Sequence, residues 1–138
     1  MDDLRGRHLA TFGALMLMLS GAFNLLDGVV AVANPGYFEH PHLLFADVSA
    51  WGWWFVAYGA AELLVGLAVL RGSQIALWPA VILAGFNAVS QLAFVASFPA
   101  WSLSIVALDV LAIYGFVSQG MAMGVELVEP ERDTRTVA

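Results

Sequence analysis

The chain has 138 residues, of which 61% are hydrophobic and 12% are charged, and its mean hydropathy is +0.82. Soluble domains are roughly 45–50% apolar, so this composition indicates an integral membrane protein. The formal net charge is −6, with five Arg and no Lys, which leaves no basic patch to bind nucleic acid. The absence of Cys excludes disulfides, thiolate metal sites and thiol nucleophiles.

Four apolar stretches are each close to the length of roughly 20 residues that a membrane-spanning helix requires. They cover about residues 9–32, 50–70, 75–96 and 102–123. In the third stretch Pro79 predicts a helix that begins near Leu77 or is kinked there. Residues 98–101 are expected to form a tight turn before the last stretch. The sequence predicts an all-α integral membrane four-helix bundle, with one four-span domain over residues 1–127 and a disordered cytoplasmic tail over 128–138.

The arginines predict the orientation of the bundle. All five fall on one side of the predicted spans: Arg5, Arg7, Arg71, Arg132 and Arg135. Because positive residues gather on the cytoplasmic side, we expect a multi-pass protein of the plasma (inner) membrane with both termini inside. The first outer loop, residues 33–49, carries several aromatic and aliphatic residues and is expected to contain a short interfacial segment.

Small residues recur along three of the predicted helices. Gly52, Gly59 and Gly66 are spaced by seven, as are Ala14, Gly21 and Gly28, while Ala80, Ala84 and Ala88 are spaced by four. Smooth stripes of this kind let helix backbones approach closely in a membrane, where lipid tails leave no hydrophobic drive between helices. We therefore expect the first two spans to pack as a tight antiparallel hairpin and the third to pack closely as well.

Three carboxylates, Asp27, Glu62 and Asp109, lie inside separate spans that contain no Lys or Arg. Charged groups in a membrane are costly and usually face protein, and Asn24, Asn87 and Gln91 are expected to join them in a polar cluster. One interpretation is that the acids are protonated and hold helices together by hydrogen bonds to Asn24, Asn87, Gln91, Ser90, Tyr58 or backbone carbonyls. The other is that they bind a proton, a cation or the head of an amphiphile such as a quinone or lipid.

Weaker signals concern metals and catalysis. Glu39, His40 and His42, with Asp47 nearby, carry side chains that could bind a metal, although a polar surface loop is the favoured interpretation. No His lies within a span to ligate haem, and no Ser has a nearby His base. We expect no cofactor and no enzymatic activity, with an extracytoplasmic metal enzyme as a weaker option.

The stretch from Asp47 to Tyr114 resembles a family of small four-span membrane proteins from actinobacteria, classified as a domain of unknown function. The matching residues are Asp47, Trp51-Gly52-Trp53, Gly59, Gly66, Arg71-Gly72, Pro99, Trp101, Leu108-Asp109 and Tyr114. The family usually also carries Trp-Ala-Arg after the second span, where this chain has Gln74-Ile75-Ala76-Leu77-Trp78. The resemblance implies the architecture and an actinobacterial plasma membrane, and it supplies no activity.

These observations predict a non-enzymatic accessory subunit or self-associating scaffold. Its partners would be the lipid bilayer and either further copies of the chain or a larger membrane complex. The alternative is a protein that binds a proton, a cation or an amphiphile through the intramembrane carboxylates.

Overall fold

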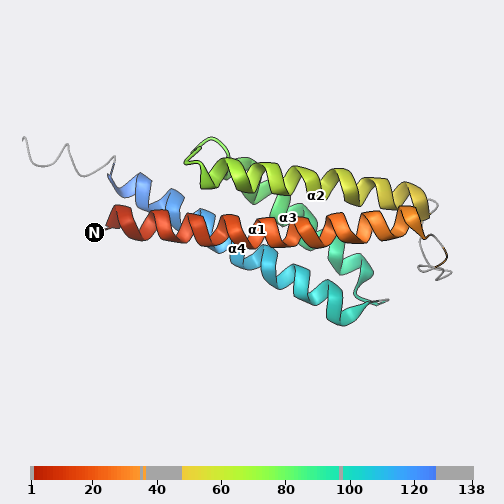
Figure 1. Cartoon of the computed structure of the whole chain (residues 1–138). Coiled ribbons are helices and arrows are strands. Elements are labelled where there is room, and N and C mark those ends of the chain that lie inside the picture. The colour runs from red at the N-terminus through yellow and green to blue at the C-terminus, as the bar shows by residue number, and fades with distance from the viewer. Residues whose placement is uncertain (1, 35, 37–47, 97, 127–138) are drawn as a thin grey trace, which may run out of the picture.

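The computed structural model describes residues 2–34, 36, 48–96 and 98–126. It contains four helices, α1 (Asp2–Ala33), α2 (Val48–Leu70), α3 (Leu77–Phe94) and α4 (Pro99–Glu126), packed as a bundle (Figure 1). The predicted all-α architecture is thus confirmed. Each helix is long and apolar enough to cross a membrane, over residues 6–33, 49–70, 77–94 and 99–121. Helices suit such sequences because every backbone polar group in lipid must be satisfied within the segment.

The ends of α3 and α4 follow from their prolines. Pro79 is the third residue of α3, where a backbone N–H would have no partner inside the helix, so α3 begins at Leu77 as the sequence predicts. The tight turn expected over residues 98–101 is wrong for its last three, because α4 begins at Pro99. Proline is favoured at a first helical position for the same reason: its fixed φ fits the helix and no donor is lost.

The turn between α2 and α3 depends on Gly72, whose φ is +87°. The Gly72 N–H donates to the Val69 carbonyl at 2.9 Å, and the Ser73 N–H donates to the Ala68 carbonyl at 3.0 Å. This pair of bonds is the Schellman motif, which satisfies carbonyls at a helix end and places glycine in the left-handed region. A side chain at residue 72 would be strained by the backbone conformation even though the surrounding space is open.

The most extensive packing joins α1 and α2, which run antiparallel side by side (Figure 1). A Cβ added to Gly59 would lie 2.5 Å from the Gly21 carbonyl oxygen, and one added to Gly28 would lie 2.5 Å from the Val56 nitrogen. The two backbones therefore touch along the glycine stripes, as the predicted hairpin requires. A second close approach, not predicted from the sequence, joins α4 to α1, where a Cβ on Gly115 would meet the Leu9 carbonyl oxygen at 2.5 Å.

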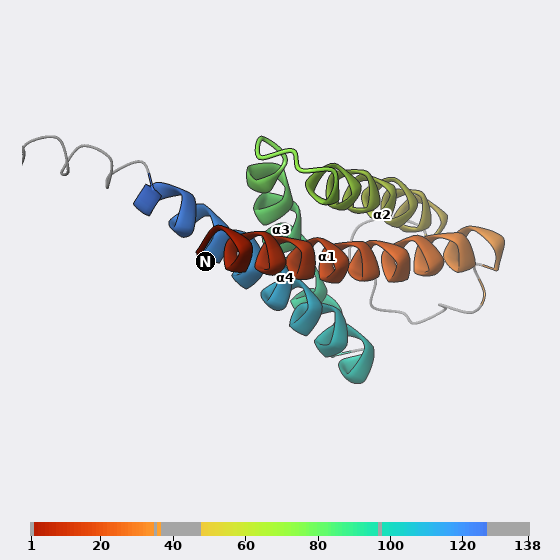
Figure 2. The same cartoon turned by 60° about the vertical axis from the view of Figure 1, so that its left-hand side comes forward.

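The remaining helices pack less evenly around this hairpin. α4 crosses α1 obliquely, and α3 packs mainly on α4 with only slight contact to α2 (Figure 2). Aromatic pairs bridge α2 and α3, including Trp51 with Phe94 and Tyr58 with Phe86. The bundle is thus a close pair of helices joined to a second, more oblique pair.

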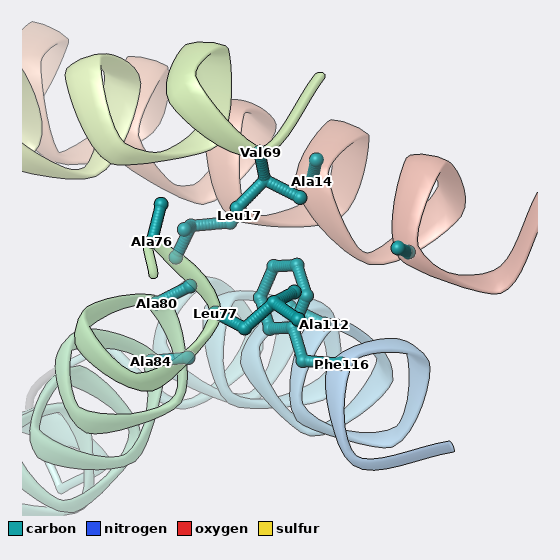
Figure 3. Close-up of a cluster of buried hydrophobic side chains, with 10 residues drawn as sticks. Ala14, Leu17, Val69, Ala76, Leu77, Ala80, Ala84, Ala112 and Phe116 are labelled. Carbon is teal, nitrogen blue, oxygen red and sulfur yellow. The ribbon is translucent and has the colours of Figure 1, made fainter. Parts of the chain in front are cut away.

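The apolar core occupies one end of the bundle, next to the turn between α2 and α3. Most of its members are small, and Phe116 fills the space among them (Figure 3). The buried core residues are Ala10, Ala14, Leu17, Val69, Ala76, Leu77, Ala80, Ala84, Ala112 and Phe116. Small side chains let four helices come close at this level, which brings the polar residues of the next layer within bonding distance.

Candidate functional site: a polar network among four helices

A layer of polar side chains follows the apolar core along the bundle. On α1 the buried positions change from Ala10, Ala14 and Leu17 to Ser20 and Asn24, one and two turns farther along the helix. On α3 the same change runs from Ala80 and Ala84 to Asn87 and Gln91. α2 contributes Glu62 and α4 contributes Asp109. All six polar side chains are at most 3% exposed, so none of them faces lipid: Ser20, Asn24, Glu62, Asn87, Gln91 and Asp109.

Asp109 is bound through both carboxyl oxygens. The Ser20 hydroxyl of α1 donates to Oδ1 at 2.8 Å, and the Asn87 amide of α3 donates to Oδ2 at 2.8 Å. Asn87 Nδ2 also donates to Ser20 Oγ at 3.0 Å, which closes a triangle of three bonds. This group ties α1, α3 and α4 together at one level of the bundle.

Glu62 is bound through one oxygen only. Asn24 Nδ2 of α1 donates to Oε2 at 2.8 Å, and Gln91 Nε2 of α3 donates to Asn24 Oδ1 at 3.3 Å. Glu62 Oε1 is buried and has no hydrogen-bond partner among the residues that the structure describes. Burying an oxygen without a hydrogen bond is costly, so the burial of Glu62 Oε1 is the least well compensated in the network.

Asp27 stands apart from these two groups. It lies on α1 three residues beyond Asn24, is partly buried, and accepts a hydrogen bond at 2.7 Å from Trp101 Nε1 of α4. The Trp101 ring also packs against Phe23, with ring centroids 5.1 Å apart. The structure therefore joins five of the six expected cluster residues in two groups and gives Asp27 a separate partner.

Ser20 is the member that the sequence analysis missed as a network residue. Its signal was present, because Ser20 and Asn24 are separated by four residues and must share a face of α1. Two expected donors do not bind the acids: the Tyr58 hydroxyl donates to the Leu83 carbonyl at 2.6 Å, and the Ser90 hydroxyl donates to the Phe86 carbonyl within α3. The buried acids therefore bind residues on the closely packed helix faces and not residues at partly exposed positions.

The chemistry open to this network follows from its donors. The carboxyl oxygens receive hydrogen bonds from amides and a hydroxyl, and no Lys or Arg that could neutralise them lies between Arg7 and Arg71 or between Arg71 and Arg132. Amide donors stabilise an acid in either protonation state without supplying a full positive charge. The arrangement can therefore hold helices together and can hold a proton.

The metal-capable candidates Glu39, His40 and His42, together with Asp47, lie outside the described residues. So do the expected interfacial segment and the tail over 128–138. The metal hypothesis stays a prediction.

Replacing Glu62 by glutamine should preserve the fold. The glutamine carbonyl can accept the Asn24 bond that Glu62 Oε2 accepts now, and the volume is unchanged. We expect a loss of less than about 1 kcal/mol, because a single interhelical hydrogen bond in a membrane averages only ~0.6 kcal/mol. Thermal melting of helicity in detergent measures this, and an unfolded Glu62→Gln variant would contradict a neutral fastening role.

Residues 9–121 match the family described as Domain of unknown function (DUF7144), which covers most of the chain and includes the whole stretch that carries the resemblance. The predicted actinobacterial source stays a prediction. No curated protein and no solved structure matches the chain.

Proposed function

The chain belongs to the DUF7144 family, and we propose that this small four-span membrane protein is a non-enzymatic accessory subunit or self-associating scaffold. We further propose that it lies in the plasma membrane with both termini in the cytoplasm. Arg7, at the start of α1, and Arg71, in the turn between α2 and α3, lie at the same end of the bundle, which supports this orientation (Figure 1).

The main support for the proposal is that the polar side chains of the network bind one another inside the bundle. Three of the four oxygens on Glu62 and Asp109 accept hydrogen bonds from side chains of other helices. The outer surface instead presents large apolar side chains, among them Ile75, Trp78 and Val89, which are 86%, 75% and 68% exposed. The outer faces of the helices are therefore apolar and suit contact with lipid and with other membrane helices.

Native mass spectrometry from mild detergent tests the proposal. We expect masses that are multiples of the 14.8 kDa chain, or the chain together with another membrane protein. The Glu62→Gln variant is the matched control, because a side chain that is 0% exposed cannot contact a second copy and should leave the assembly unchanged. A protein that is monomeric and without partners under all mild conditions would contradict the scaffold role.

A second candidate function is favoured by the unpaired Glu62 Oε1. A protein that only fastened its helices would gain by satisfying this oxygen, and intramembrane acids commonly serve proton or ion pathways. We therefore keep the binding of a proton, a cation or an amphiphile as the alternative to a purely structural role.

A further inference from the structure

We propose that Glu62 is a proton-binding site, with an exchangeable proton held on Oε1 inside the bundle and with no metal ion involved. This proposal rests on the second candidate function and specifies a proton as its ligand. Glu62 is 0% exposed, its Oε2 accepts a hydrogen bond from the Asn24 amide at 2.8 Å, and its Oε1 is buried without a partner in the described part of the chain.

The surrounding groups favour a proton over a metal cation. Cations such as Ca²⁺ take six or more oxygen ligands. Around Glu62 the neighbouring oxygens already accept hydrogen bonds, Asn24 Oδ1 from Gln91 and the two Asp109 oxygens from Ser20 and Asn87, so a cation would have to compete with these donors. A proton needs only the one free oxygen.

Among the residues that the structure describes, the titratable groups that interact with Glu62 are acidic. Asp109 of α4 and Tyr58 of α2 interact with it electrostatically, whereas α1 and α3 present only amide and hydroxyl groups in this layer. Asp27, the acid in the second half of α1, accepts a hydrogen bond from Trp101. Two ionised carboxylates repel each other when no cation lies between them, so one proton on the pair lowers the energy.

The hydrogen bonds indicate which acid carries that proton. Asp109 accepts a bond at each oxygen, which suits an ionised carboxylate, whereas Glu62 accepts only one. A proton on Asp109 would weaken one of the two bonds that its oxygens accept, whereas a proton on Glu62 Oε1 disturbs no existing hydrogen bond. The proton therefore belongs on Glu62.

Infrared difference spectroscopy on the full chain in lipid vesicles tests this assignment. We expect a carbonyl stretching band from a protonated buried carboxyl that moves to lower frequency in ²H₂O, which shows exchange. The band should disappear in Glu62→Gln and remain in the matched control Asp27→Asn, whose carboxyl is paired elsewhere. It should lose intensity as pH rises, with uptake of one proton per chain on return to lower pH.

Three results would overturn the proposal. One is a band that survives unchanged in folded Glu62→Gln. Another is a titration that Na⁺ or K⁺ displaces at fixed pH, since this would make a cation the ligand. The third result applies if Glu62→Gln does not fold. Glu62→Asp must then retain the band at an altered frequency, and an unaltered band in Glu62→Asp would overturn the proposal. Helicity and native mass, measured on the same samples, report separately whether the structural role fails.

Discussion

Replacing Gly59 by alanine is expected to weaken the pairing of α1 and α2 by about 1–3 kcal/mol, the usual cost of adding a methyl group to a packed site. The new Cβ would lie 2.5 Å from the Gly21 carbonyl oxygen and 2.6 Å from the Leu25 nitrogen. Both atoms belong to the backbone of α1 and cannot rotate away, so the helices would have to separate. This also weakens the interhelical bond from Asn24 to Glu62, which lies one turn from Gly59.

The matched control is Gly85→Ala on α3, where an added Cβ meets nothing within 4 Å. Alanine is favoured over glycine in a helix by about 1 kcal/mol, so this variant should be as stable as the parent or slightly more so. Unfolding by SDS in mixed micelles, followed by circular dichroism, compares the two. Equal stability of Gly59→Ala and Gly85→Ala would show that the glycine stripe does not set the contact between α1 and α2.

Replacing Asp109 by leucine is the second change with a large expected effect. It removes the acceptors of both the Ser20 hydroxyl and one Asn87 hydrogen, and both of these donors are buried. Leaving a buried donor unsatisfied costs about 1–3 kcal/mol. We expect a loss in this range, although leucine suits lipid better than aspartate.

Asp109→Asn provides the comparison for that result. Asparagine can accept from Asn87 through its carbonyl while the Ser20 hydroxyl turns to accept from the new amide, so we expect less than about 1 kcal/mol of lost stability. The same SDS titration measures both variants. If Asp109→Leu is as stable as Asp109→Asn, the network contributes little to the fold and the fastening role is wrong.

The helices could be predicted from the sequence because lipid leaves few choices. An apolar stretch near 20 residues must form a helix in the bilayer, and Pro79 and Gly72 mark an end and a turn by local sterics alone. The start of α4 was predicted wrongly because its signal in the sequence was ambiguous. Pro99 suits both a turn and a first helical position, and only the bond from the Ser102 N–H to the Phe98 carbonyl at 2.9 Å shows the latter.

Most residues of the candidate site could be predicted from the sequence, but which of them bind one another could not. Helical spacing placed Asn24, Glu62, Asn87 and Gln91 on packed faces, because residues four apart share a face whatever the fold. Spacing carries no information on which faces meet, or at what level. Asp27 therefore seemed equivalent to Glu62 and Asp109, until the crossing of α4 over α1 gave it Trp101 as a partner.

The amino-acid sequence by itself determined that this protein is a bundle of four apolar helices with carboxylates among them, because hydrophobic length and residue spacing act within a single helix. The tertiary structure alone decided that Asp109 is bound at both oxygens and Glu62 at one. That difference depends on the register between helices, whose backbones lie in close contact at Gly59 and Gly115. Hydrogen bonds form only over about 3 Å, so register, and not composition, selects the acid that retains a free oxygen.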